Sequence, residues 1–180
     1  ADRIGRIWSE LRENCRFAYV SGAASGGRLH VRDVFLTDAT DITLPATLGA
    51  GEAVTDFAFS PDGAWLAFRA GATDAQRLYV YSLADIGGQA TPIGLQCPAP
   101  GDACTVLDYA WSEDSRRVAV VVRGDLGGTQ DYLTGVDVSV SAEPWPMLGV
   151  AADIDRSIVY VSELTWIDAR NVAFVASDPF

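Results

Sequence analysis

The side chains that could carry out chemistry in this sequence include a single histidine and two pairs of aspartates. His30 lies in a run of alternating apolar and polar residues, and it has no second histidine with which to build a metal site. Asp38 with Asp41 and Asp153 with Asp155 lack the series of oxygen ligands around a central glycine that tight calcium loops use. We therefore interpret His30 as a structural or surface residue and the aspartates as solvated loop residues, with calcium binding as the alternative.

Two glycine-rich segments raise the possibility of hydrolase or dinucleotide chemistry. Segment 22–27 contains Ser25 but lacks the G-x-S-x-G spacing of a nucleophile elbow. Segment 49–51 reads Gly-Ala-Gly, and no helix is expected after it, so it does not fit a dinucleotide loop. We predict no catalytic, cofactor-binding or metal-binding residue in these 180 residues and no enzyme activity. Whether a longer parent protein carries a catalytic domain stays open.

The spacing of the cysteines bears on whether the protein resides in an oxidising or a reducing cellular compartment. Cys97 and Cys104 bracket a turn-rich segment with two prolines, which would let the chain fold back and close a disulfide. Their spacing does not suit the CxxC pairs of structural zinc sites. We predict a Cys97–Cys104 disulfide, with two free thiols as the alternative, and hence a periplasmic or extracellular protein. Cys15 is expected to be a small buried hydrophobic residue.

The composition argues against several partners. The net charge is −11, and all 13 basic residues are arginines. Phosphate binding needs a basic surface, so nucleic acid is not an expected partner. No apolar run approaches the roughly 18 residues of a membrane span, so membrane insertion is not expected. The sequence is 49% hydrophobic and 10% aromatic, as expected for a folded protein.

A pattern of an aromatic residue, a short turn and a β-rich segment occurs four times. The aromatic anchors are Trp8, Phe59, Trp111 and Trp166, at successive spacings of 51, 52 and 55 residues. A period near 50 residues in a β-rich sequence predicts a propeller or a solenoid. Aromatic residues at one repeated position are expected to pack in the core and not to stack on a ligand.

The clearest turn is Ser60-Pro61-Asp62-Gly63, in which proline presets φ and glycine permits the tight exit. We expect Asp62, and equally Asp114 and Asp168 in the next two copies, to accept hydrogen bonds from backbone amides of its own turn. The segment after each turn carries an alanine at one position, where neighbouring sheets would pack closely: Ala18, Ala67, Ala119 and Ala173.

Alternation and turn residues predict the strands of each copy. These are 16–21, 28–36 and 42–48 in copy one; 54–59, 65–69, 77–82 and 90–94 in copy two; 106–111, 117–123, 132–140 and 147–150 in copy three; 158–166 and 171–177 in copy four. Almost no helix is expected. We interpret residues 1–180 as one propeller segment with repeats at about 7–50, 54–100, 106–150 and 158–180.

The Ser60–Gly63 turn, preceded by an aromatic residue and followed by Leu66-Ala67-Phe68, resembles the repeat of TolB-like propellers, also called PD40 or WD40-like repeats. Leu78-Tyr79-Val80 matches the strand that follows in that family. Copy three departs from the pattern with Ser112-Glu113-Asp114-Ser115. The resemblance implies four-stranded antiparallel blades, of which about three and a half are present, and therefore an incomplete ring, because family members usually have six to eight blades.

The resemblance also implies a function. TolB-like propellers are non-catalytic scaffolds that bind protein or peptide partners in the bacterial envelope, and we expect this role here. Remaining blades or another chain would have to cover the open strand edges. The alternative is a substrate-gating propeller of a prolyl-oligopeptidase-like serine peptidase whose catalytic domain lies outside the chain. A lyase-like or sugar-binding propeller is disfavoured by the single histidine.

Overall fold

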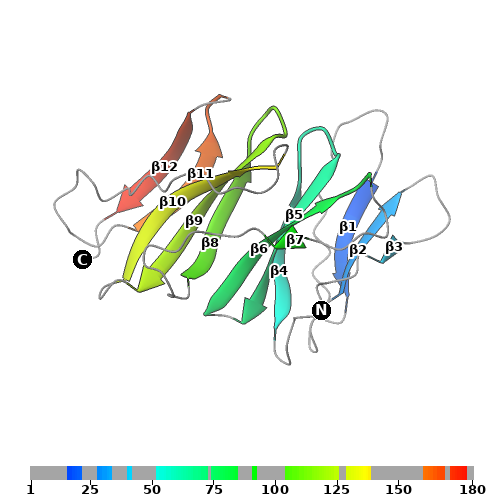
Figure 1. The fold of residues 1–180 in the computed structure, drawn as a ribbon, viewed down its shortest axis with the longest axis horizontal. Helices are drawn as coiled ribbons and strands as arrows, with labels where there is room; N and C mark the ends of the chain where they lie inside the picture. The colour runs from blue at the N-terminus through cyan, green and yellow to red at the C-terminus, as the bar shows by residue number, and fades with distance from the viewer. Residues whose placement is uncertain are drawn as a thin grey trace. The chain divides into compact units, whose positions relative to one another are not determined.

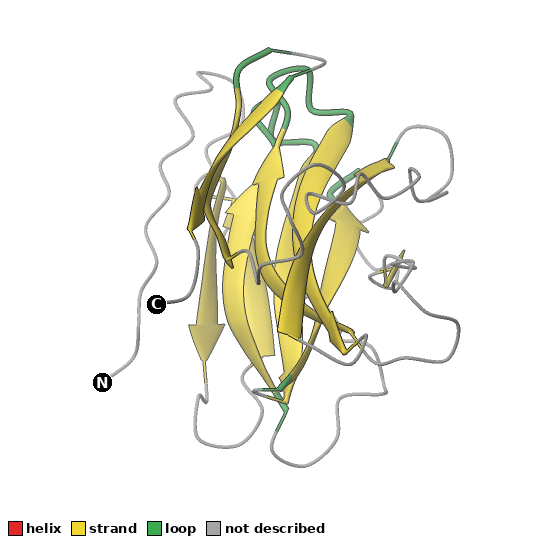
Figure 2. Ribbon diagram, turned by 90° about the vertical axis from the view of Figure 1, so that its left-hand side faces the viewer, coloured by secondary structure: helices red, strands yellow, loops and turns green. Residues whose placement is uncertain are grey.

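The computed structural model describes residues 16–21, 28–33, 40–41, 52–72, 74–84, 91–92, 104–125, 129–138, 160–168 and 171–177. These residues form β-strands joined by turns, and every strand pairing among them is antiparallel (Figures 1 and 2). This confirms the expected all-β class with antiparallel sheets. None of the described segments forms a helix that is long and apolar enough to cross a membrane. The chain divides into two compact units, residues 1–92 and 93–180.

The first unit contains two sheets. Blade 1 has the order β1-β2-β3 and blade 2 the order β4-β5-β6-β7. The strands are β1 Arg16–Ser21, β2 Arg28–Asp33, β3 Thr40–Asp41, β4 Ala53–Phe59, β5 Trp65–Ala72, β6 Ala75–Ser82 and β7 Thr91–Pro92. Blade 2 is thus the four-stranded meander expected of a propeller blade. Its outermost strand is short, and its proline suits an edge position because proline has no N–H to donate.

The second unit also contains two sheets. Blade 3 is formed by β8 Cys104–Trp111, β9 Arg117–Asp125 and β10 Thr129–Asp137, and blade 4 by β11 Tyr160–Trp166 and β12 Val172–Ser177. Every expected strand that includes described residues is present, with shifted ends: Val138 and Asn171 lie just outside β10 and β12, and β3 at Thr40–Asp41 was not expected. The expected strands 42–48 and 147–150 lie outside the described residues.

The strand registers show which residues occupy equivalent positions in the four blades. Ala67 pairs with Ala58 on one side and Val80 on the other, and Ala119 pairs in the same way with Ala110 and Gly135. Thr165 pairs with Ala173, and Ala18 pairs with Val31. The four repeated alanines therefore occupy one position in the blades, and β1 corresponds to β5, β9 and β12.

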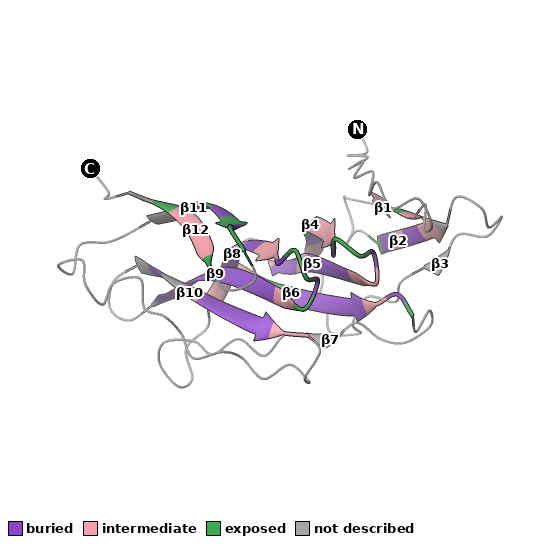
Figure 3. Cartoon of the chain, turned by 90° about the horizontal axis from the view of Figure 1, so that it is seen from above, coloured by how far each residue is buried: buried purple, intermediate pink, exposed green. Residues whose placement is uncertain are grey.

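Successive side chains of a strand point to opposite faces of its sheet, so each blade has two faces. We call the face that bears the repeated alanine the alanine face and the other the aromatic face, because it bears Tyr19, Phe68 and Phe174 in three of the blades. Buried residues are concentrated on β5, β6, β9 and β10 (Figure 3).

Each unit has its own core between two blades. In the first unit, the alanine face of blade 1 packs on the aromatic face of blade 2, where Phe68 and Tyr79 stack at 5.2 Å between ring centroids. In the second unit, Ala119 and Val121 on the alanine face of blade 3 pack with Leu164 and Trp166 of blade 4. Both cores therefore bring the same two kinds of face together.

Candidate functional site

The turn between β4 and β5 is held by a serine and an aspartate. The buried Ser60 hydroxyl donates a 2.6 Å hydrogen bond to Asp62 Oδ1, which also accepts the Ala64 N–H at 2.9 Å. Gly63 has φ +68° and donates its N–H to the Ser60 carbonyl at 2.8 Å. The Asp62 carboxylate is therefore engaged within its own turn.

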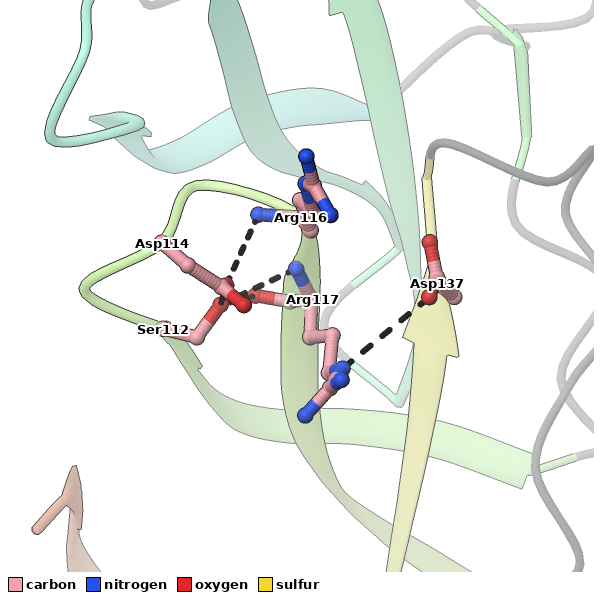
Figure 4. Close-up of polar contacts among 5 residues, drawn as sticks. All are labelled: Ser112, Asp114, Arg116, Arg117 and Asp137. Carbon is pink, nitrogen blue, oxygen red and sulfur yellow. Dashed lines mark hydrogen bonds and ion pairs between the residues drawn. The ribbon is translucent and has the colours of Figure 1, made fainter. Parts of the chain in front are cut away.

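The turn between β8 and β9 repeats this arrangement (Figure 4). The buried Ser112 hydroxyl donates to Asp114 Oδ1 at 2.6 Å, and the Arg116 N–H donates to the same oxygen at 3.2 Å. The Arg117 N–H donates to Ser112 Oγ at 3.0 Å. Ser115, with φ +59°, occupies the position at which the first turn has glycine. Copy three therefore keeps the turn without the Asp-Gly pair, but Ser115 has to adopt a left-handed backbone conformation that glycine adopts more easily.

The turn between β11 and β12 uses its aspartate differently. Asp168 Oδ1 accepts the Asn171 N–H at 2.9 Å, and Asp168 Oδ2 accepts the Asn171 side-chain amide at 2.7 Å. The Ile167 N–H donates to the Asn171 carbonyl at 2.9 Å. All three turns therefore use a carboxylate to satisfy backbone donors, although the third has no preceding serine.

The electrostatics of the Ser112–Arg117 turn keep its carboxylate ionised. The hydrogen bond from Ser112 lowers the pKa of Asp114, and the backbone hydrogen bond and positive charge of Arg116 and the charge of Arg117 act in the same direction. The Arg117 guanidinium also lies 3.9 Å from Asp137 across the sheet. A carboxylate with a lowered pKa and occupied acceptor sites is a poor general acid, so these groups serve the turn.

The far end of blade 3 holds an ion pair that the sequence analysis missed. Arg123 and Asp131 are directly paired across β9 and β10, and the guanidinium donates two hydrogen bonds of 2.7 and 3.1 Å to the carboxylate. Asp131 is 2% exposed. The sequence feature that could have indicated this ion pair is the placement of Arg123 and Asp131 on either side of Gly127-Gly128.

Blade 2 places a buried glutamine at the matching position. Gln76 pairs with Gly71 in the register, as Asp131 pairs with Arg123 in blade 3. Its amide donates to the carbonyls of Gly71 and Ala72 at 2.9 and 2.6 Å, and its oxygen accepts the Thr55 hydroxyl at 2.8 Å. A buried polar side chain therefore closes the same hairpin end in both blades.

His30 lies on the aromatic face of blade 1. Its Nε2 and Ser21 Oγ are joined by a 2.7 Å hydrogen bond, and its ring stacks on Tyr19 at 4.7 Å between centroids. Asp41 is opposite His30 in the register of β2 and β3. A hydrogen bond between serine and histidine also occurs in nucleophile–base pairs. Here the histidine ring stacks on Tyr19 within the sheet, so the contact serves to hold the two strands together. Among the described residues there is no group of three His, Cys, Asp or Glu side chains that could hold a metal ion.

The aromatic anchors differ in burial. Trp166 is buried, and its indole N–H donates a 2.9 Å hydrogen bond to the Ala110 carbonyl in the preceding blade. Phe59 is half-buried against the core of the first unit, and Trp111 is half-buried. Trp8 lies outside the described residues.

Several other residues of interest also lie outside the described part of the chain: Cys15, Ser25, Asp38, Cys97, Asp153 and Asp155. Cys104, at the start of β8, is disulfide-bonded. Its strand neighbour in the register is Gly124 of β9.

A scan against models of known protein families found no match for this sequence. A search of curated protein sequences likewise found no similar protein. Among solved structures, the chain is similar to TolB from Acinetobacter baumannii, with 12% sequence identity and a TM-score of 0.49. The match covers 91% of this chain but only 38% of that TolB chain.

Proposed function

We propose that this chain is a single β-propeller segment of the TolB-like kind that acts as a non-catalytic scaffold for a protein or peptide partner, in the periplasm or outside the cell. The observation that carries the proposal is the repeated packing of an alanine face on an aromatic face in both units. Within each unit, two sheets packed in this way hold the turns at the ends of the blades in place, and such turns can bind a partner. The disulfide at Cys104 supports an oxidising compartment.

The polar side chains of the described turns support a structural and not a catalytic role. The carboxylates of Asp62, Asp114 and Asp168 accept hydrogen bonds from their own turns. The ion pair of Arg123 and Asp131 is held within one hairpin. These groups fix the ends of the blades, and a binding scaffold needs such fixed ends to present a constant surface.

The partner is proposed to bind at the turn end of the second unit. The hydrogen bond joins Trp166, the last residue of β11, to Ala110, the second-to-last residue of β8, so the β11–β12 and β8–β9 turns lie at one end of the unit. Among the described residues, this end exposes three acidic residues, Glu113, Asp114 and Asp168, and one basic residue, Arg116. Ile167, in the β11–β12 turn, is 64% exposed. An exposed apolar side chain on a surface with an excess of acidic residues fits a basic peptide that carries an apolar anchor.

The experiment is to pan a random-peptide display library against the immobilised chain and to measure the affinity of enriched peptides by calorimetry. Enrichment of basic sequences with an apolar residue is expected, and Ile167→Asp should abolish their binding. Val175→Asp, at another exposed apolar position of blade 4 (48% against 64% for Ile167), is the matched control and should bind normally. Absence of enrichment, or binding that survives Ile167→Asp, would contradict the proposal.

A further inference from the structure

The turn between β4 and β5 contains a pair of residues that can react with each other. Asp62 is followed by Gly63, and nowhere else in the sequence does a glycine follow an aspartate or an asparagine. Such a pair is prone to cyclise, because glycine has no side chain to crowd its nitrogen or to restrict its backbone. Whether the two residues react in the folded chain depends on what their reacting atoms contact.

The reaction open to this pair is isomerisation through a succinimide. The Gly63 nitrogen bonds to Asp62 Cγ, and the N–H proton leaves with the carboxyl hydroxyl as one molecule of water. Water then adds back to the ring. When it adds at the main-chain carbonyl carbon of Asp62, the bond from that carbon to the Gly63 nitrogen breaks, and the chain runs through Asp62 Cβ as isoaspartate. The water consumed equals the water released, so no other reagent is needed.

In the folded turn, both reacting groups are engaged in hydrogen bonds. The Gly63 N–H, whose proton has to leave, donates to the Ser60 carbonyl at 2.8 Å. Asp62 Oδ1 accepts the Ser60 hydroxyl at 2.6 Å and the Ala64 N–H at 2.9 Å. The Ser60 hydroxyl is itself held in place, since its oxygen accepts the Trp65 N–H at 3.0 Å. The ring can therefore close only after the contacts of the nitrogen and the carboxylate have opened.

The pair is nevertheless accessible to water. Pro61 and Asp62 are exposed, whereas Ser60 is 1% exposed. Solvent can reach the carboxyl group, so the restraint on the reaction comes from the hydrogen bonds and not from burial. Opening of this one turn is enough to release the pair, and local opening needs less free energy than global unfolding.

The turn between β8 and β9 has the same contacts but a different residue at the reacting nitrogen. The Ser112 hydroxyl donates to Asp114 at 2.6 Å, and the Ser115 N–H donates to the Ser112 carbonyl at 2.9 Å. Ser115 has φ +59° where Gly63 has φ +68°. The Ser115 side chain crowds the nitrogen that would attack, so Asp114 provides an internal reference for Asp62.

We propose that Asp62 is a site of spontaneous aspartate isomerisation, and that the Ser60 hydroxyl restrains the reaction while the turn is folded. Isoaspartate adds one carbon to the main chain between Ser60 and Trp65, where the Ser60 N–H donates to the Trp65 carbonyl at 3.0 Å. The added carbon changes the span that these contacts bridge, so the modified turn is less stable. Phe59, which packs against the core of the first unit, directly precedes it. The inference is independent of partner binding.

The test is to incubate the whole chain at neutral pH and to measure isoaspartate by mass-spectrometric peptide mapping. Chymotryptic cleavage after Phe59 and Trp65 isolates residues 60–65, in which Asp62 is the only aspartate. In urea, where the chain is unfolded, isoaspartate should form faster at Asp62 than at Asp114. In the folded wild type, the rate at Asp62 should be lower by about tenfold or more, because several hydrogen bonds have to open first.

Ser60→Ala is the decisive variant, and Ser112→Ala is its matched control. Ser60→Ala should raise the folded-state rate at Asp62 by about fivefold, since it removes the hydroxyl that binds the carboxylate. Ser112→Ala removes the same hydroxyl from the equivalent turn and should leave the rate at Asp62 unchanged. Circular dichroism checks that both variants are folded.

Three results would overturn the proposal. The first is a rate at Asp62 in folded Ser60→Ala equal to that of the folded wild type. The second is a wild-type rate that is the same in the folded and the unfolded chain, and this comparison decides the matter if Ser60→Ala does not fold. The third is an unfolded chain in which Asp114 isomerises as fast as Asp62.

Discussion

The indole N–H of Trp166 donates a 2.9 Å hydrogen bond to the carbonyl of Ala110, 56 residues earlier in the chain and in the preceding blade. The acceptor lies one residue before Trp111, the counterpart of Trp166 in the repeat. The aromatic anchor of blade 4 therefore fills the core between two blades and also fixes their register at the turn end.

Trp166 is expected to contribute more to stability than Trp111. Trp166→Ala should lower the free energy of unfolding by about 3–5 kcal/mol, as buried large-to-small aromatic changes do. Trp166→Phe keeps much of the ring but removes the N–H, and it should cost about 1–2 kcal/mol. Urea unfolding of both variants measures these effects. Trp111→Ala, at a half-buried anchor, serves for comparison, and a larger loss there would show that the wrong anchor has been placed in the core.

Gly71 is expected to be less replaceable than Gly63. A Cβ on Gly71, where φ is +143°, would collide with the Ala75 carbonyl oxygen, so Gly71→Ala should destabilise the chain by about 3 kcal/mol or more. Gly63 has φ +68°, a conformation that Ser115 adopts at the matching turn, so Gly63→Ala should cost only about 1 kcal/mol. Denaturant midpoints compare the two, and equal losses would contradict the hairpin geometry.

The sequence was sufficient for the strands because strand alternation and turn chemistry are local properties. Ser60–Gly63 and its relatives are visible without knowing what packs on them. The sequence did not predict the single-residue bulges. There is one each in β4, β8 and β11, which lie between Val54 and Asp56, between Val106 and Asp108, and between Ser162 and Thr165. An extra residue in one strand is defined only against its partner strand, so alternation alone does not reveal it.

The candidate site was predictable to a similar extent. The turn roles of Asp62, Asp114 and Asp168 follow from short-range residue chemistry. The contact between Arg123 and Asp131 depends on the register of a hairpin, and the contact between Trp166 and Ala110 depends on how two blades pack. The half-burial of Trp111, where the repeat suggested a core residue, likewise depends on tertiary packing.

Asp114 is expected to make stability depend on pH. Its folded pKa is lowered from 3.8, so its contribution is fully present above that value and is lost as the pH falls through the folded pKa. Asp114→Ala should therefore be less stable than wild type at neutral pH, and the difference should shrink below pH 3.8. Because the side chain is exposed, added salt should weaken the part due to the arginines.

The hydroxyl of Ser112 is the first cause of this lowered pKa, so Ser112→Ala provides the control. In that background, adding Asp114→Ala should change stability much less with pH than it does in the wild type. Chemical denaturation of the wild type, the two single variants and the double variant at several pH values completes this double-mutant cycle. An Asp114 effect that grows on acidification would contradict the assignment.

Breaking the Arg123–Asp131 pair should be more harmful than replacing it. Asp131→Ala leaves the guanidinium, whose side chain is 30% exposed, without its carboxylate, and should cost about 2–3 kcal/mol. A double Arg123→Met, Asp131→Leu variant removes both charges and should lie within about 1 kcal/mol of wild type. Thermal and urea unfolding measure both. A double variant as unstable as Asp131→Ala would indicate that the pair itself is required.

The disulfide of Cys104 is proposed to close on Cys97. Peptide mapping without reduction should recover the two cysteines in one linked peptide and leave Cys15 as a thiol. Cys97→Ser should then lower stability by about 2–3 kcal/mol, because the bridge closes a short loop. A linked peptide that contains Cys15 and Cys104 would contradict the pairing.

The packing of successive blades is the claim on which both the scaffold and the proposed partner-binding end depend, and solution NMR of the Trp166 indole tests it most directly. We predict a nuclear Overhauser effect between the indole N–H of Trp166 and the α-proton of Ala110, together with slow exchange of that N–H with solvent. An indole N–H that exchanges as fast as an exposed tryptophan and shows no contact with Ala110 would contradict the account.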